Sequence, residues 1–328
     1  MRMTRALMGL LALAVLGVVV GGGAAAAEER AKIRLIVLPG SQWYAVEAMK
    51  RGGFFEKHNL EIERKDVASV PAIYTALRAD AGDIAFAGWV SNLQYRAQGL
   101  DFLNIFPLTE FHNDILVRAD SPIKQMSELK GKRVGIYGGP AGTTTAMFKV
   151  QVGKFFGIDP DRDIKLHFGA SPLLGGLLEK GEVDAIMVTD PVTTKLLQSG
   201  KFRSIGNLNQ IHRERTGEGL LMLTITTRDE FARKHPETVK AFLRAYVDAM
   251  GYLRGNAALW QELARASGIE SKEGAEMLRS RLEKNYLTGW DEQYIGKQLD
   301  FAREIQNLLG KKYLPEIPAD GLTLTYSP

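Results

Sequence analysis

The 328-residue chain contains no cysteine. Thiol nucleophiles, thiolate metal sites and disulfides are therefore excluded, and stability must come from a large hydrophobic core. The five histidines show no metal-ligand spacing such as H-x-x-x-H, so we assign no residue to a metal. The sequence also shows no catalytic triad, and we predict no cofactor.

The chain has no strong charge bias either, with 42 Lys+Arg against 38 Asp+Glu. Without Arg2 and Arg5 of the N-terminal segment, 40 basic residues remain against 38 acidic ones. The basic residues form no block with interleaved aromatics, so no nucleic-acid partner is expected. The length, with 45% hydrophobic and 24% charged residues, suits about two globular domains.

The N-terminal segment has the pattern of an export signal. Arg2 and Arg5 precede an apolar run from Ala6 to Val20, and small residues from Ala24 to Ala27 come before Glu28. We predict a cleaved signal peptide over residues 1–27 and a periplasmic location for the mature chain. The alternative is an uncleaved membrane anchor, because the uncharged stretch is about long enough to cross a bilayer.

The body of the chain shows an α/β pattern. Apolar β-type runs alternate with helical patterns from Ile33 to about Thr227, which is typical of parallel sheets covered by helices. The strands Leu103–Phe106 and Asp114–Val117 are expected to complete a first lobe, and Arg133–Tyr137 to open the second. From Arg228 onward the pattern is almost wholly helical.

One short pattern occurs in both halves. Gly82-Asp83-Ile84-Ala85 and Gly181-Glu182-Val183-Asp184-Ala185 each combine a glycine-acidic turn with a short strand after a helix. This fits two related lobes, and it also fits any pair of αβ units. Open α/β sheets bind ligands beyond the carboxyl ends of their strands, so the ligand-binding residues are expected in the turns that follow the strands.

The turn from Gly138 to Thr145 is the strongest candidate site. It lies between a strand that ends at Tyr137 and a helix that begins near Thr144. Glycines allow close backbone approach, threonines offer hydroxyls, and a helix N-terminus supplies free N–H groups. We predict a cradle for sulfonate, carboxylate or phosphate oxygens, and an ordinary capped helix start is the alternative. The ligand-binding residues expected here are Gly139, Gly142, Thr143, Thr144 and Thr145.

Other turns are expected to line the same cleft. Aromatic side chains could stack on a flat or apolar ligand, and hydroxyl, amide and carboxylate groups could hydrogen-bond to it. Ser91 and Asp190 could instead cap helices, and one of the aromatics could belong to the core. The segment Phe111–Asp114 adds a histidine near the rim. The ligand-binding residues expected in these turns are Ser41, Gln42, Trp43, Tyr44, Ser69, Trp89, Ser91 and Asp190.

Several segments together resemble one known family. Gly52–Leu60, followed by Glu61-Ile62-Glu63, resembles the "GFFEKxGLDVE" segment of extracytoplasmic solute-binding proteins of ABC importers, in the alkanesulfonate, taurine, nitrate and thiamine-precursor (NMT1/THI5-like) group. The resemblance continues through the two glycine-acidic turns, through Leu129–Gly135, and through Asp190-Pro191. Its segments cover most of the chain from residue 33 to residue 191.

The resemblance implies a fold and its boundaries. The family has a two-lobed α/β periplasmic-binding-protein fold of type II, with two crossovers and a ligand cleft between the lobes. Carried onto this chain, lobe one covers residues 32–117 plus 220–328, and lobe two covers residues 118–219. The hinge is expected near residues 117–120 and 217–221.

The resemblance also implies a function. We expect a monomeric, non-enzymatic receptor that delivers a small organic solute, a sulfonate or carboxylate and possibly an aromatic one, to the permease of an ABC importer. A thiamine-precursor pyrimidine is the alternative ligand. An enzyme on the same fold is the alternative function, although the related synthases are cytosolic and use a cysteine-rich motif that is absent here. A membrane-tethered sensor would require an uncleaved leader.

Overall fold

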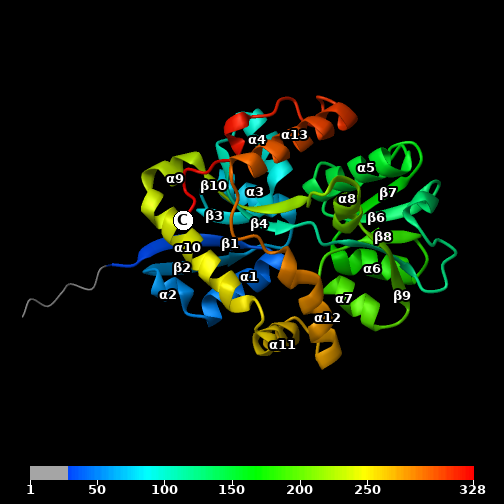
Figure 1. Ribbon diagram of the computed structural model, residues 1–328, viewed down its shortest axis with the longest axis horizontal. Coiled ribbons are helices and arrows are strands. Elements are labelled where there is room, and N and C mark those ends of the chain that lie inside the picture. The colour runs from blue at the N-terminus through cyan, green and yellow to red at the C-terminus, as the bar shows by residue number, and fades with distance from the viewer. Residues whose placement is uncertain (1–28) are drawn as a thin grey trace, which may run out of the picture.

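Two five-stranded sheets form the centres of two lobes that lie side by side (Figure 1). The computed structural model describes residues 29–328, so the predicted signal peptide lies outside the described residues. The expected alternation of strands and helices is confirmed. Within residues 29–328, no helix is both long enough and apolar enough to cross a membrane.

The first sheet has the strand order β2-β1-β3-β10-β4. Strands β1, β2 and β3 run parallel, and β10 lies antiparallel between β3 and β4. The strands are β1 (Ala31–Val37), β2 (Leu60–Asp66), β3 (Ile84–Gly88), β4 (Phe102–Glu110) and β10 (Leu221–Arg228). The helices of this lobe are α1 (Ser41–Arg51), α2 (Phe54–Lys57), α3 (Val70–Arg78), α4 (Trp89–Ala97), α9 (Asp229–Lys234) and α10 (Pro236–Leu253).

The second sheet repeats this arrangement in the order β7-β6-β8-β5-β9. Its strands are β5 (Asp114–Arg118), β6 (Arg133–Tyr137), β7 (Lys165–Gly169), β8 (Ala185–Met187) and β9 (Phe202–Asn207). Its helices are α5 (Thr143–Phe156), α6 (Ser171–Glu179), α7 (Val192–Gln198) and α8 (Leu208–Thr216), with a 3-10 turn at Met126–Leu129. Strand β5 takes the antiparallel position that β10 takes in the first sheet.

The expectation that Asp114–Val117 completes the first lobe is wrong. Strand β5 pairs with β8 and β9 of the second sheet, with Ile115 opposite Met187. The chain leaves the first sheet at Glu110 and enters the second at Asp114, with only residues 111–113 between them. Sequence pattern cannot assign an apolar strand to one of two neighbouring sheets, because both offer the same buried surroundings. The first crossover therefore precedes the hinge expected near residues 117–120.

The two lobes share one detailed corner. The backbone N–H of Arg34 in β1 donates to the Asp83 carboxylate at 2.8 Å, and the N–H of Arg133 in β6 donates to Asp184 at the same distance. Each guanidinium also binds the same carboxylate. Each aspartate N–H in turn donates to the arginine carbonyl at 2.8 Å. The repeated glycine-acidic pattern thus forms the same structure twice, which supports two related lobes.

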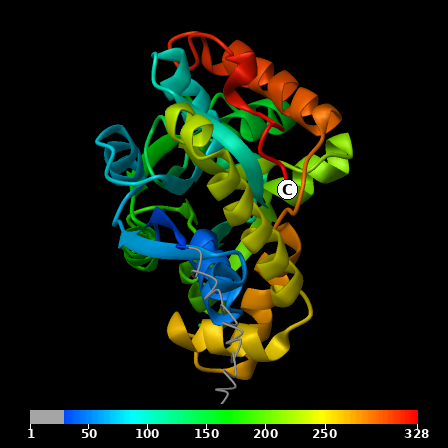
Figure 2. The same cartoon turned by 90° about the vertical axis from the view of Figure 1, so that its left-hand side faces the viewer.

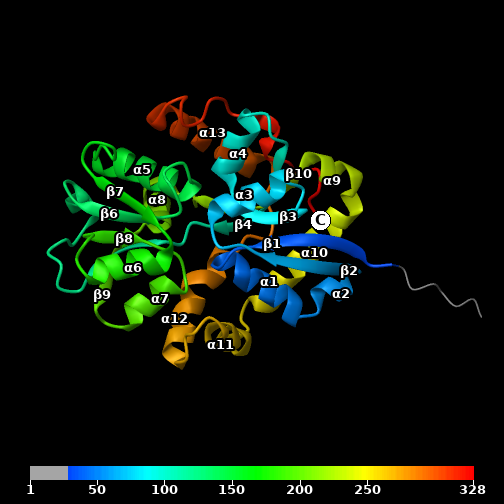
Figure 3. The ribbon, with the colours of Figure 1, turned by 180° about the vertical axis from the view of Figure 1, so that it is seen from behind.

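The C-terminal helices touch both lobes (Figures 2 and 3). Helix α10 packs on α1, whereas α13 (Glu292–Leu309) packs on α5 of the second lobe. Phe301 and Ile305 of α13 share a buried cluster with Phe148 of α5. The helices between them are α11 (Ala257–Ala266) and α12 (Lys272–Leu282), and 3-10 turns lie at Glu283–Asn285 and Ala319–Gly321. The C-terminal helices from α10 to α13 therefore connect the two lobes by packing on both.

The repeated corner gives a test of stability. The Asp83 side chain is 6% exposed and the Asp184 side chain 29% exposed. We expect Asp83→Ala to lower the free energy of unfolding by about 2 kcal/mol, because the buried Asp83 carboxylate accepts from both the backbone N–H and the guanidinium of Arg34, although Asp80 still pairs with that guanidinium. Asp184→Ala should cost about 1 kcal/mol, because water can replace the lost carboxylate. Urea unfolding measures both, and an equal or reversed order would contradict this account of the corner.

Candidate functional site

A cavity of about 60 Å³ lies between the lobes, at the carboxyl ends of β1, β3, β6 and β8. This is the edge at which open α/β sheets bind ligands. The first lobe contributes Leu38, Pro39, Gly40, Ser41, Gln42, Val70, Ile73, Phe86, Ala87, Gly88, Ser91, Met222 and Leu223. The first crossover and the second lobe contribute His112, Asn113, Tyr137, Gly138, Gly139, Gly142, Thr143, Thr144 and Thr189.

Three helices begin at this cavity. Helices α1, α4 and α5 follow Gly40, Gly88 and Gly142, and none of these glycines can cap its helix with a side chain. The first-turn N–H groups of a helix have no intrahelical acceptor, and its N-terminus carries a partial positive charge. Among the described residues that line the cavity, none is Lys, Arg, Asp or Glu. Backbone N–H groups and hydroxyls therefore dominate its polar chemistry, which suits a small anion.

The two lobes touch across the cavity at Thr143. Its Oγ1 accepts from the backbone N–H of Ser91 at 3.2 Å, and it lies 3.2 Å from the Ser91 hydroxyl. A hydroxyl of the second lobe thus caps helix α4 of the first. A Cβ added at Gly88 would lie 2.3 Å from Thr143 Oγ1, so only glycine permits this approach. The lobes are therefore in a closed arrangement.

The glycine turn of the second lobe is held from two sides. The Thr145 hydroxyl donates to the Gly139 carbonyl at 2.7 Å. The Tyr313 hydroxyl, from the segment after α13, lies 3.1 Å from the Ala141 carbonyl and 3.3 Å from that of Gly142. These contacts fix the turn and leave the hydroxyl of Thr144, a lining residue, as a candidate donor to an occupant.

His112 and Asn113 lie on the first crossover and face the cavity from between the lobes. The Asn113 amide donates to the Val188 carbonyl at 2.7 Å. Burial lowers the pKa of His112, and burial raises the pKa of Tyr137 to about 12. Both side chains are therefore neutral near pH 7.

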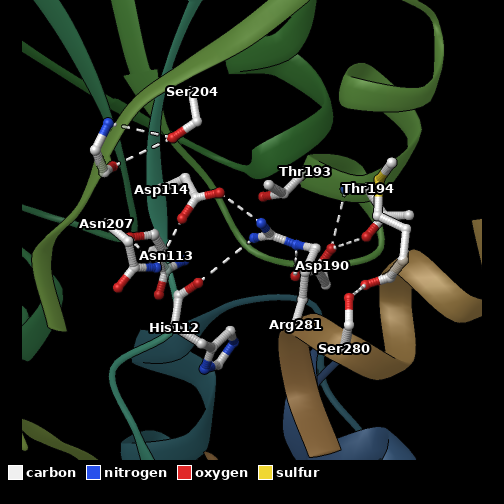
Figure 4. A network of polar contacts seen from close by, with 12 residues as sticks. His112, Asn113, Asp114, Asp190, Thr193, Thr194, Ser204, Asn207, Ser280 and Arg281 are labelled. Atoms are coloured by element: carbon white, nitrogen blue, oxygen red, sulfur yellow. Dashed lines mark hydrogen bonds and ion pairs between the residues drawn. The ribbon is translucent and has the colours of Figure 1, made fainter. Parts of the chain in front are cut away.

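Beside the cavity, Arg281 of α12 bridges to two carboxylates of the second lobe (Figure 4). It pairs with Asp114 at the start of β5, and its Nε lies 3.2 Å from Asp190. Asp190 is fully buried and also accepts from the N–H of Thr194 at 3.0 Å. Burial acts to lower the pKa of Arg281, but the two carboxylates outweigh it and raise that pKa. The guanidinium is therefore a permanent cation in this cluster.

A second, more open hollow of about 500 Å³ lies on the other side of the first crossover. Charged side chains line it, but several are already paired with one another: Arg213 with Glu110, and Arg281 with Asp114. The interlobe cavity is therefore the better candidate site. Among residues 29–328, no group of three or more His, Asp or Glu is placed to hold a metal ion.

The structure brings part of the predicted site together. The predicted residues that line the cavity are Ser41, Gln42, Ser91, Gly139, Gly142, Thr143 and Thr144. They come from the first turns of α1, α4 and α5 and from the glycine turn. Their contact with a ligand remains a prediction.

The aromatic side chains expected to stack on a ligand lie elsewhere. Tyr44 is 1% exposed and packs on Trp260, with ring centroids 6.0 Å apart. Trp43 packs against the same core. Trp89 is fully buried, and its indole N–H donates to the Leu221 carbonyl at 2.8 Å. The first turns of α1 and α4 direct these rings toward the core. A core position for one of the aromatics was the alternative to ligand stacking.

Three polar predictions are also outside the described lining. Thr145 binds the turn itself, and Asp190 binds Arg281 and caps α7. Ser69 is exposed and stands at the N-cap of α3. The structure thus gives Thr145 and Asp190 structural partners, and a contact of either residue with a ligand stays a prediction.

Sequence reasoning missed other lining residues. Tyr137 and Thr189 directly adjoin turns that were selected, so a wider window would have included them. Met222 and Leu223 gave no local signal, because β10 reaches the cavity only through its pairing with β3. Ile73 and Phe86 have the pattern of ordinary core residues of a helix and a strand, so the sequence does not single them out.

Comparisons with known proteins agree with this geometry. A family model described as "NMT1/THI5 like" matches residues 45–257, more than half of the chain. The taurine-binding periplasmic protein of Escherichia coli (strain K12) is 28% identical over 156 residues, which is 45% of this chain and 45% of that protein. The match thus spans less than half the length of that relative.

Two further proteins extend the comparison. The 4-amino-5-hydroxymethyl-2-methylpyrimidine phosphate synthase of Schizosaccharomyces pombe (strain 972 / ATCC 24843) is 22% identical over 248 residues, 71% of this chain and 67% of that protein. The alkanesulfonate-binding protein SsuA from Xanthomonas axonopodis pv. citri, bound to MOPS, has a TM-score of 0.74 at 20% identity, covering 90% of this chain and 99% of that one. The predicted two-lobed periplasmic-binding-protein fold is therefore confirmed.

The contact between Gly88 and Thr143 generates a prediction about shape. In Gly88→Ala, the new methyl group would also lie 2.7 Å from Thr143 Cβ, so a rotation of the Thr143 side chain cannot relieve the clash. We expect the lobes to stay further apart, with a larger radius of gyration by small-angle X-ray scattering. Gly139→Ala is the matched control, because a Cβ there meets nothing within 4 Å. Identical scattering from both variants and the parent would refute the closed contact.

Proposed function

This chain belongs to the NMT1/THI5-like family, and on that premise we propose that it is a solute receptor of an ABC importer. The receptor binds a small organic anion in the interlobe cavity and delivers it to the permease. The observation that carries this proposal is the convergence of three helix N-termini, each with glycine at its N-cap, on a cavity without Lys, Arg, Asp or Glu in its described lining.

The polar part of the cavity suits an acid group. The N–H groups of α1, α4 and α5 and the hydroxyls of Ser41 and Thr144 can share the oxygens of a sulfonate or carboxylate. Such an arrangement binds an anion without a buried counter-ion, whose desolvation would be costly. The solute itself then forms no ion pair with a buried side chain that would have to be broken on its release.

The remaining lining suits an organic group. Val70, Ile73, Phe86, Met222 and Leu223 are apolar and lie on the first-lobe side. The cavity is small, so we expect a small solute in it. A short-chain sulfonate or carboxylate fits both halves of the lining.

The relatives support the class of solute and the setting. One relative is named for binding taurine, and another for binding alkanesulfonates. A periplasmic location after cleavage of the leader, a permease partner and a monomeric state are parts of the same proposal. N-terminal sequencing of the exported protein would test the cleavage.

A non-enzymatic role completes the proposal. His112 is the one histidine among the described lining residues, burial lowers its pKa, and no carboxylate, lysine or cysteine joins it in that lining. The relation to a pyrimidine phosphate synthase keeps an enzyme as the alternative function. A thiamine-precursor pyrimidine is the alternative solute, favoured by the same uncharged lining.

A binding screen tests the function itself. Titration calorimetry with short sulfonates, carboxylates, nitrate and 4-aminopyrimidines should give a hit with an affinity of about −8 to −12 kcal/mol, the micromolar to nanomolar range. The bound compound should be recovered unchanged by mass spectrometry. Conversion of the compound, or binding of pyrimidines alone, would replace this proposal with the corresponding alternative.

Substitution of the cavity threonines tests the place of binding. Thr143→Ala and Thr144→Ala should each weaken the hit by about 1.5–3 kcal/mol if each hydroxyl bonds a charged group. Ser69→Ala is the control, because this serine lies outside the cavity lining. Unchanged affinity in both threonine variants, with a lowered melting temperature, would leave these residues only a structural role at the helix start.

A further inference from the structure

Tyr137 is a second-lobe residue whose ring belongs to a first-lobe core. It is the last residue of β6, and it packs against a buried cluster that consists of first-lobe residues. Of the described residues packed against this cluster, Tyr137 is the one that comes from the second lobe. Leu38, Ile73 and Ala87 of the cluster also line the interlobe cavity, as Tyr137 does. The ring therefore crosses between the lobes at the cavity itself.

The duplicated topology explains where this ring lies. Arg34 of β1 and Arg133 of β6 occupy equivalent places in the repeated corner. Four residues further along the chain come Leu38 and Tyr137, so these two positions are also equivalent. Leu38 is 3% exposed and stays in the core of its own lobe. The longer side chain of Tyr137 reaches the same cluster from the opposite lobe.

The two sides of the cavity are held together differently. On the α4 side, Trp89 and Leu93 of the first lobe share one buried cluster with Phe148 of the second. On the α3 side, Ile73 belongs to the first-lobe cluster, and Tyr137 is the second-lobe residue that packs on that cluster. Opening on the α4 side would expose a shared hydrophobic core to water, whereas opening on the α3 side exposes mainly one ring.

We propose that Tyr137 is the gate residue of the solute site: its ring closes the α3 side of the cavity, and a solute enters and leaves when the ring withdraws. The inference rests on the proposed function, and it adds a residue that controls the rate of release whatever the class of solute. Burial of the ring favours the closed arrangement, because it removes apolar surface from water. Loss of the ring should therefore shift the population toward open lobes.

Release kinetics test the gate. The probe is the tightest binder found by calorimetry among ethanesulfonate, propanoate, nitrate and 4-aminopyrimidine, and stopped-flow displacement from the full chain gives its dissociation rate. We expect Tyr137→Ala to release the probe at least about tenfold faster, because the variant lacks the buried ring. Tyr137→Phe keeps the ring and should stay within about twofold of the parent. Tyr252→Ala is the control, because Tyr252 is 40% exposed and does not line the cavity.

The two Tyr137 variants separate a gate from a direct hydrogen bond. Equally fast release from Tyr137→Phe and Tyr137→Ala would show that the hydroxyl binds the solute, and would overturn the gate. Release at the parent rate from both variants would overturn it as well, because the ring would then have no part in closure.

A fluorine label tests the cross-lobe contact without a solute and without removal of the ring. A 3-fluorotyrosine label at Tyr137 gives an NMR signal whose shift between H2O and D2O becomes smaller when the ring is buried. We expect a smaller isotope shift in the otherwise unchanged chain than in the labelled Gly88→Ala variant, whose lobes should stay further apart. Equal isotope shifts would overturn the gate alone. Failure of every probe to bind would instead reject the proposed function, and the gate with it.

Discussion

The relation between the lobes depends on the ion pairs of Arg281. A guanidinium from α12 lies between Asp114, at the start of β5, and Asp190, just after β8, and all three side chains are at most 13% exposed. Buried ion pairs add little net stability compared with apolar packing, but loss of one partner is costly because a charge stays behind without compensation. Parting of the lobes must therefore break this cluster or carry α12 with the second lobe.

The cavity is a product of the duplicated topology. In each lobe, parallel strands end at the edge that faces the other lobe, and the following helices begin there. Helix N-termini from both lobes consequently converge on a small volume, and glycine at each N-cap keeps side chains out of it. The proposed binding of an anion therefore depends mainly on the backbone N–H groups at these helix starts.

The fold and the turns that line the cavity could be predicted from the sequence, because both depend on local patterns. The alternation of strand and helix, and glycine-rich turns such as Gly138–Thr145, are visible within ten residues. The predictions were wrong or incomplete where contacts between distant parts of the chain determine the position of a residue. Asp114–Val117 was placed in the wrong sheet, Trp89 and Tyr44 proved to be core residues, and Met222 reaches the cavity only through strand pairing. Asp190 was predicted to bind the ligand or to cap a helix. Its ion pair with Arg281 could not be predicted, because Arg281 lies 91 residues away in the chain.

The central claim is that a small organic anion binds between the lobes with its acid group at the three helix N-termini. A crystal structure of the protein with a bound short-chain sulfonate or carboxylate tests it most directly. The account expects the acid oxygens within hydrogen-bond distance of the first-turn N–H groups of α1, α4 or α5, enclosed by both lobes. Ligand density outside this cavity, or an acid group directed away from the helix N-termini, would contradict it.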